Sequence, residues 1–211
     1  MIKKKITIID YGAGNIRSIE RALNKIGYPT IITNNNNEVK EAESLILPGV
    51  GAFNKAMERL NELNLIEAIT DYCKSGKPFL GICLGMQLLC SKSFEFGETN
   101  GLNIIPGTVK NISEFKEFND NTKIPIIGWY EVKNKKKSLT SIQSQNKVFY
   151  HIHSFYCDLD EKENELFTSS INGLNICTGI NKDNVYGFQF HPEKSRVQGI
   201  ELLNKFCDID Y

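Results

Sequence analysis

Short apolar runs alternate with amphipathic stretches over roughly the first 90 residues of the chain. Four of the runs are bounded by glycine, proline or polar positions, as short strands are. They lie at residues 5–9, 30–33, 44–47 and 78–83. Between them, helical patterns occupy residues 16–26, ending at Gly27, and then 55–65 and 84–90. Because neighbouring parallel strands need a crossover, this alternation predicts an α/β fold with a mostly parallel central sheet flanked by helices.

The pattern changes between about residues 95 and 190, where short β-like runs are separated by Gly, Asn, Asp and Lys. These runs predict that the second half of the chain adds antiparallel strands to the sheet. Apolar positions over 198–206 predict a final helix. The asparagine-rich segment 34–38 is expected to be a turn or loop, because Asn tolerates the local conformations that loops need. We find no internal repeat, and residues 1–211 are expected to form one domain.

Composition excludes several kinds of partner. The 25 Lys and Arg residues balance 25 Asp and Glu residues, so no net field would hold the phosphates of a nucleic acid. Six cysteines occur without a CxxC pair or zinc-type spacing to histidine, so we expect reduced thiols and neither a metal nor another cofactor. The apolar run after Met1 is too short for a signal peptide or a membrane span. We therefore expect a soluble, cytoplasmic protein that binds neither nucleic acid nor membrane.

The segment GICLGMQ, residues 81–87, places Cys83 between two glycines, after an apolar run and before a predicted helix. Such a strand-to-helix turn raises a side chain above the carboxyl edge of the sheet, where ligands of open α/β sheets bind. The N-terminus of the helix would stabilise a thiolate. Cys83 is therefore either a nucleophile or one of six buried thiols, and a nucleophile also needs a base.

The segment FQFHPEK supplies a candidate base, His191. Pro192 keeps His191 out of the helical region, and in an extended chain His191 and Glu193 project to the same side. A carboxylate in that position fixes the orientation and tautomer of the ring and stabilises the imidazolium. The alternative is a strand end with two exposed polar residues. Together with Cys83, however, the pair completes the set of groups that acyl transfer requires.

Acyl transfer also needs hydrogen-bond donors for the oxyanion. The backbone N–H of Leu84, directly after the nucleophile, is one candidate. The glycine-rich segment PGVGAF follows a predicted strand at the same edge of the sheet, so Gly49, Val50 and Gly51 could bring further amides to a bound carbonyl. On its own, this segment is equally typical of a simple turn.

The motifs PGVGAF, GICLGMQLL and VYGFQFHPEKS, in this order and at these distances, resemble those of the class I, triad-type glutamine amidotransferases. More narrowly, DYGAGNIRS and HPEKS are similar to segments of the glutaminase subunit of imidazole glycerol phosphate synthase. The resemblance covers essentially the whole chain. It implies a class I glutamine amidotransferase-like fold.

The resemblance also implies roles for individual residues. Cys83 would attack the carboxamide carbon of L-glutamine, His191 would protonate the leaving nitrogen, and Glu193 would orient His191. Water would then hydrolyse the glutamyl thioester. The implied substrate-binding residues are Gly49, Val50, Gly51, Leu84, Gln87, His153, Ser154 and Phe155. His151 and His153 would also suit a metal, but we favour a glutamine-contact strand, with the Ser154 backbone more involved than either imidazole.

A chain of 211 residues with this glutaminase leaves little room for a domain that uses the ammonia, so a partner must receive it. The resemblance implies a heterodimer with a (β/α)8-barrel cyclase subunit of histidine biosynthesis, which takes ammonia through a channel. Tyr11, Asn15 and Trp129 are candidates for the interface with this partner. We expect low glutaminase activity without the partner, because uncoupled hydrolysis would waste glutamine.

Two departures from the family pattern keep other acceptors open. Tyr130 stands where the family usually has Asn in a GWN motif, and residues 196–198 replace small residues after HPEKS. Both segments could face the partner. A paralogous glutaminase that supplies a surface-polysaccharide or flagellin sugar amidotransferase is therefore an alternative, as is a catalytically silent module with the same fold.

Overall fold

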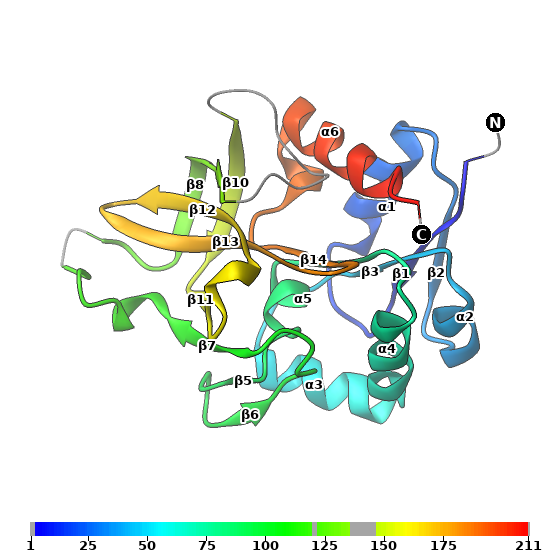
Figure 1. Ribbon diagram of the computed structural model, residues 1–211, viewed down its shortest axis with the longest axis horizontal. Coiled ribbons are helices and arrows are strands. Elements are labelled where there is room, and N and C mark those ends of the chain that lie inside the picture. The colour runs from blue at the N-terminus through cyan, green and yellow to red at the C-terminus, as the bar shows by residue number, and fades with distance from the viewer. Residues whose placement is uncertain (1–2, 120–121, 136–146, 211) are drawn as a thin grey trace.

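A mixed eight-stranded sheet forms the centre of the computed structural model, which describes residues 3–119, 122–135 and 147–210 (Figure 1). The strand order is β2-β1-β3-β4-β14-β13-β12-β9. The parallel part consists of β2 (Thr30–Thr33), β1 (Ile6–Ile9), β3 (Ser44–Leu47), β4 (Phe79–Ile82) and β14 (Val185–Phe188). The antiparallel part consists of β13 (Leu174–Lys182), β12 (Glu165–Ile171) and β9 (Lys133–Asn134). The predicted α/β class, with a mostly parallel sheet and added antiparallel strands, is confirmed.

One strand of the second half does not follow the antiparallel expectation. β14 lies beside β4 and pairs with it in parallel, with Gly187 opposite Gly81. Parallel neighbours need a long connection, which here is the whole chain between the two strands. This pairing brings the segment after β14 to the carboxyl edge of β4, where Cys83 lies.

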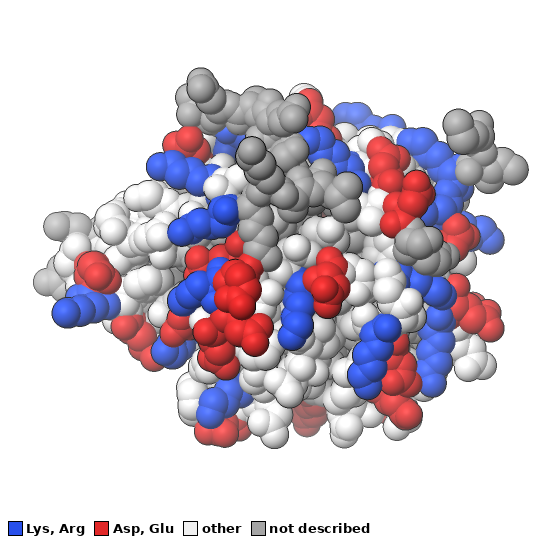
Figure 2. All heavy atoms as spheres, viewed as in Figure 1, with Lys and Arg blue, Asp and Glu red and all other residues white. Residues whose placement is uncertain are grey.

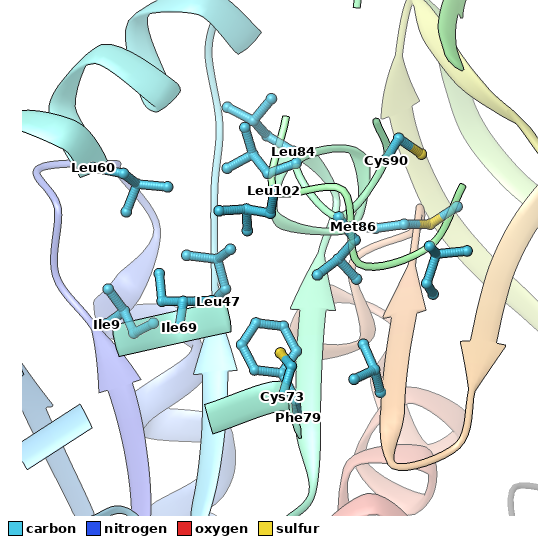
Figure 3. Close-up of a cluster of buried hydrophobic side chains, with 14 of the residues drawn as sticks. Ile9, Leu47, Leu60, Ile69, Cys73, Phe79, Leu84, Met86, Cys90 and Leu102 are labelled. Carbon is cyan, nitrogen blue, oxygen red and sulfur yellow. The ribbon is translucent and has the colours of Figure 1, made fainter. Parts of the chain in front are cut away.

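Helices cover both faces of the sheet. One face carries α1 (Ile16–Lys25) and α6 (Arg196–Cys207). The other carries α2 (Asn36–Glu41), α3 (Phe53–Glu62) and α4 (Leu65–Lys74). Successive strand side chains alternate between the two faces, so Ile8 packs in the core with α1 and α6. Ile9 packs in the other core, with α3 and α4 (Figure 3).

Three expectations about the helices were wrong. The segment 34–38 is not all turn or loop, because the side chain of Asn35 accepts from the backbone N–H groups of Asn37 and Glu38 and caps α2. The helical pattern over 55–65 crosses a break at Asn64, which has a positive φ of 54° and separates α3 from α4. The helix expected over 84–90 is shorter, since α5 spans only Leu84–Gln87.

Two smaller sheets stand beside the central one. The first pairs β8 (Ile126–Glu131) with β10 (Val148–His153), and the second contains β11 (Phe155–Leu159), β7 (Gly107–Asn111), β5 (Lys92–Ser93) and β6 (Thr99–Asn100). Single 3-10 turns occupy η1 (Ile112–Glu114), η2 (Lys162–Asn164) and η3 (Pro192–Lys194). The chain crosses from the first small sheet to the second at Ser154, which belongs to the candidate site.

Charges of both signs are interspersed over the face of the molecule drawn in Figure 2, in keeping with the balanced composition. Within the three described ranges, no helix combines the length and apolar character needed to cross a membrane.

Candidate active site

Cys83 lies in a tight turn between β4 and α5. Its backbone has φ 54° and ψ −109°, a conformation that residues other than glycine rarely adopt. Its N–H donates to the carbonyl of Phe188 on β14. A Cβ added to Gly81 would lie 2.5 Å from the carbonyl oxygen of Gly85, and one added to Gly85 would lie 1.9 Å from that of Leu47. The two flanking glycines are therefore required for the close approach of strand and helix, as the sequence predicted.

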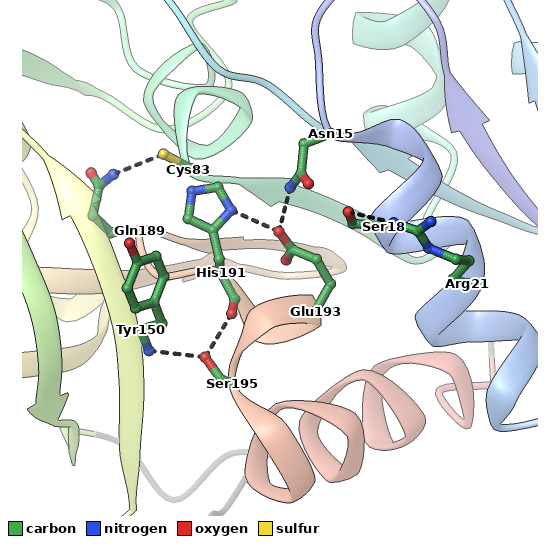
Figure 4. Close-up of polar contacts among 9 residues, drawn as sticks. All are labelled: Asn15, Ser18, Arg21, Cys83, Tyr150, Gln189, His191, Glu193 and Ser195. Carbon is green, nitrogen blue, oxygen red and sulfur yellow. Dashed lines mark hydrogen bonds and ion pairs between the residues drawn. The ribbon is translucent and has the colours of Figure 1, made fainter.

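His191 and Glu193 follow β14 and lie beside this turn (Figure 4). His191 has an extended backbone, with φ −100° and ψ 95°, and its Nδ1 is 2.8 Å from Oε1 of Glu193. Both side chains are buried, and the amide of Asn15 donates to the same carboxylate oxygen. The Nε2 atom of His191 has no oxygen or nitrogen partner within the described residues and points toward the sulfur of Cys83. The three residues proposed as a triad are thus brought together in a line.

The surroundings of His191 favour its protonated form. Burial favours the neutral ring, but hydrogen bonding and charge interactions with Cys83 and Glu193 outweigh burial and raise the pKa of His191 to about 10. The ring therefore carries a proton at neutral pH. Such an imidazolium is suited to pair with a thiolate and to protonate a leaving group.

A cavity of about 330 Å³ opens over Cys83 and His191. Seven of the eight predicted substrate-binding residues line it: Val50, Gly51, Leu84, Gln87, His153, Ser154 and Phe155. Gly49 is the exception. Its Cα packs against the hydroxyl of Tyr11, where an added Cβ would lie 2.4 Å away, and its carbonyl faces α5.

The cavity wall also contains three residues that were not predicted from the sequence, Glu95, Ile152 and Lys194. Lys194 could have been inferred from the HPEK motif. Glu95 stands in no motif, because a contact with a distant segment holds its side chain in place. Its carboxylate accepts the backbone N–H of Phe53, in the first turn of α3, at 2.7 Å. Among the described residues that line this cavity, Glu95 is the one that carries a carboxylate.

The predicted oxyanion donor is already occupied. The carbonyl oxygen of Gly49 lies 3.4 Å from the backbone nitrogen of Leu84 and accepts its N–H. Gly51, with φ 106°, and the half-exposed Val50 complete this loop. In this conformation the N–H of Leu84 is not available to a substrate carbonyl.

The other two histidines are buried next to each other. Nδ1 of His151 is 3.3 Å from Nε2 of His153, whose Nδ1 is 2.9 Å from the carbonyl oxygen of Phe155. Burial lowers the pKa of His151 well below its usual value and that of His153 to about 4, so both rings are neutral at neutral pH. Three of their four ring nitrogens are engaged with each other or with the backbone, and only Nε2 of His151 is buried without a hydrogen-bond partner among the described residues, which does not favour the metal alternative.

The three residues predicted to meet a partner lie in different environments. Trp129, on β8, is 40% exposed. Asn15 directs its amide inward to Glu193. Tyr11 is only 3% exposed, and its hydroxyl donates to the carbonyl of Pro48 at 2.9 Å. This corrects the expectation for Tyr11, because a ring buried in the core supports the loop after β3 rather than a docking surface.

Comparison with known proteins extends these observations. The family model described as glutamine amidotransferase class-I matches residues 7–209. The chain is similar to imidazole glycerol phosphate synthase subunit HisH of Geobacter metallireducens, with 41% identity over 205 residues that cover 96% of this chain and 97% of the relative. It is 45% identical over 206 residues to the subunit of the same name from Caldanaerobacter subterraneus, covering 97% and 98% of the two chains. Among solved structures, PurLQS from Thermotoga maritima superposes with a TM-score of 0.72 over 97% of each chain, at 16% identity, which shows a shared fold.

Proposed function

The chain belongs to the class I glutamine amidotransferases, and within them to the family of imidazole glycerol phosphate synthase subunit HisH, and from this premise we propose a residue-level mechanism. The chain hydrolyses L-glutamine to glutamate and supplies the ammonia to the cyclase subunit of that synthase. The alignment of Cys83, His191 and Glu193 beside the cavity is the observation that supports the assignment of these three residues.

In the first half of the reaction, the thiolate of Cys83 attacks the carboxamide carbon of glutamine and a C–S bond forms. The C–N bond breaks as the imidazolium of His191 gives its Nε2 proton to the nitrogen, which leaves as ammonia. In the second half, His191 takes a proton from water, whose oxygen adds to the thioester carbon. The C–S bond then breaks, the new γ-carboxyl group loses its proton to solvent as glutamate leaves, and the thiolate and imidazolium are restored. Glu193 keeps Nδ1 protonated throughout.

Glutamine enters the cavity as a zwitterion, and its α-ammonium needs a negative partner. We propose that Glu95 supplies it, because this carboxylate lines the cavity and is held in place by the N–H of Phe53. Replacing Glu95 with Gln keeps the hydrogen bond to the backbone and removes the charge. We expect KM for glutamine to rise about tenfold, with kcat little changed.

Because the carbonyl of Gly49 occupies the N–H of Leu84, we expect this conformation of the loop to hydrolyse glutamine slowly. Rotation of the peptide between Gly49 and Val50 would free the N–H of Leu84 and turn the N–H of Val50 toward the cavity, so one movement supplies two oxyanion donors. Losing a single such donor typically costs about 10² to 10³ in rate. We propose that docking of the cyclase favours the rotated loop, and that the isolated chain hydrolyses glutamine slowly.

Exposed apolar side chains near the cavity offer the surface for docking. Trp129 and Ile127 on β8 pair with Tyr150 and Ile152 on β10, and Ile152 also lines the cavity. The guanidinium of Arg196 lies 4.8 Å from the ring centre of Trp129. We propose that this surface contacts the cyclase. The names of the relatives favour the cyclase over a sugar amidotransferase as the ammonia acceptor.

The test is glutamine hydrolysis by the full chain together with its cyclase subunit. We expect Cys83→Ala to lower glutamate formation by roughly 10³-fold or more. The matched control is Cys207→Ala, which removes a buried thiol of α6 far from the cavity and should keep the activity. Ammonia release that survives in Cys83→Ala would refute the proposed mechanism.

A further inference from the structure

A buried chain of amides leads to the sulfur of the nucleophile. Gln189, between β14 and His191, is 0% exposed, and its Nε2 lies 3.7 Å from Sγ of Cys83 (Figure 4). Its Oε1 accepts from Nε2 of Gln87 at 3.0 Å, and the same Gln87 nitrogen is 3.4 Å from the carbonyl oxygen of Phe155. The mechanism above gives Gln189 no role, although it touches a reacting atom.

The direction of these hydrogen bonds is fixed by the carbonyl of Phe155. A carbonyl can only accept, so Gln87 must present its NH₂ group to it, and the second hydrogen of that group faces Gln189. Gln189 must then present its oxygen to Gln87 and its NH₂ group to Cys83. The reverse orientation of either amide would place two acceptors or two donors against each other. A sulfur that receives an N–H at this position is stabilised as a thiolate rather than as a thiol.

The histidine pair anchors the same carbonyl from the other side. His153 is neutral, so its Nδ1 carries the proton donated to Phe155, and its Nε2 accepts the proton on Nδ1 of His151. The Phe155 oxygen thus receives donors from both His153 and Gln87, which satisfies both of its lone pairs. Its position on β11, at the cavity wall, ties the amide chain to the substrate-binding segment.

We propose that Gln189 is a catalytic residue whose side-chain N–H stabilises the Cys83 thiolate, and that Gln87 is the positioning residue that holds this N–H on the sulfur. The proposal rests on the nucleophilic role of Cys83. α5 is a single helical turn, so a local donor takes over the stabilisation that the sequence assigned to a helix terminus. Gln189 and His191 approach the sulfur from different sides (Figure 4). Unlike His191, Gln189 keeps its proton during the reaction, so it remains a donor when the thiolate leaves the thioester.

The test measures the reactivity of Cys83 directly, without glutamine. The full chain is alkylated with iodoacetamide over a series of pH values; the sulfur attacks the methylene carbon, a C–S bond forms and iodide leaves. Modification of Cys83 is followed by tandem mass spectrometry, whose fragment ions separate it from Cys90 on the same tryptic peptide and from the other four buried thiols. The readout is the pH midpoint of the alkylation rate, which reports the thiolate fraction.

In Gln189→Leu, which keeps the volume and removes the N–H, we expect the midpoint to move up by about one pH unit, equivalent to a tenfold smaller thiolate fraction below the midpoint. The rate near neutral pH should fall only about threefold, because a more basic thiolate is also a better nucleophile. In Gln189→Glu the carboxylate replaces the donor by a charge of the wrong sign, so the midpoint should move further up than in Gln189→Leu. A residue that merely fills space would not produce this order.

Thr178→Val is the matched control. It removes a buried hydroxyl that lies 3.2 Å from Oγ of Ser169. Thr178 is also a direct neighbour of Gln189, because its backbone carbonyl accepts the backbone N–H of Gln189. The substitution should leave the midpoint unchanged. An unchanged midpoint in folded Gln189→Leu and Gln189→Glu, or an equal shift in Thr178→Val, would overturn the proposal. Hydrolysis by Cys83→Ala would instead refute the proposed function, so the two failures are distinguishable.

Discussion

The protonation state of His191 gives the sharpest check on the electrostatics of the site. The chain has three histidines, and burial lowers the pKa of His151 and His153 while the neighbours of His191 raise its pKa to about 10. A heteronuclear NMR titration of the full chain should therefore find one imidazolium and two neutral rings at neutral pH. The charged ring should lose its proton only as the pH rises toward about 10.

The perturbation is Glu193→Gln. The amide keeps an oxygen for Nδ1 of His191, at the 2.8 Å position of Oε1, but removes a fully buried negative charge. A hydrogen bond to a charged partner contributes about 1.5–3 kcal/mol, against about 1 kcal/mol for a neutral one. A loss of roughly 1–2 kcal/mol lowers the pKa of His191 by about one, since one pKa step corresponds to about 1.36 kcal/mol.

The sign of the accompanying change in stability follows from linkage. A histidine whose pKa is raised in the folded state stabilises that state fully below its unfolded pKa of about 6.5, and the stabilisation is lost as the pH rises through about 10. In Glu193→Gln this loss should begin at lower pH. The matched control is Asn15→Ala, which removes the amide bonded to the same carboxylate and leaves the charge, so the pKa of His191 should not fall. A wild-type value near 6.5, or no change in Glu193→Gln, would refute the reasoning.

Three further predictions follow from packing and exposure. Gly85→Ala should destabilise the fold by about 3 kcal/mol or more in urea unfolding, because its Cβ would lie 1.9 Å from the carbonyl oxygen of Leu47. The control Gly76→Ala, which has open space around it but a φ of 84°, should cost about 1 kcal/mol. Ser195→Ala should cost about 1–3 kcal/mol in the same assay, since it leaves the partly buried N–H of Tyr150 without its acceptor at 2.9 Å. Trp129→Ala should weaken cyclase binding by roughly tenfold or more in titration calorimetry while leaving the unfolding midpoint of the free chain unchanged, and undiminished affinity would contradict the proposed docking surface.

Local sequence patterns predicted those parts of the fold that depend on local chemistry. Strands at 30–33 and 44–47 are found at those residues, and the two glycines around Cys83 have the packing role expected of them. The alternation of strands and helices predicted the parallel sheet because crossover connections leave few other arrangements.

Contacts between distant segments account for what the sequence did not predict. Asn35 caps a helix because its side chain reaches two backbone N–H groups, an outcome that a run of asparagines does not distinguish from a loop. Glu95 lines the cavity, where its carboxylate is bonded to Phe53, and Gln189 meets Cys83 from the segment after β14, about a hundred residues later. Glu95 stands in no motif, and the motif around Gln189 points to His191 and Glu193 rather than to Gln189, because the partner that gives each residue its role is remote in sequence.

The late position of β14 has a consequence for how the protein is made. β4 ends at Ile82, but the strand that covers its free edge begins at Val185, so ribosomes making about 5–20 residues per second need roughly 5–20 seconds to supply it. During this interval the nascent chain presents an apolar strand edge, the kind of surface that chaperones shield and that promotes aggregation when left open. The same delay separates the thiol from its base. A ribosome-bound chain therefore cannot consume glutamine until the centre of its sheet has closed.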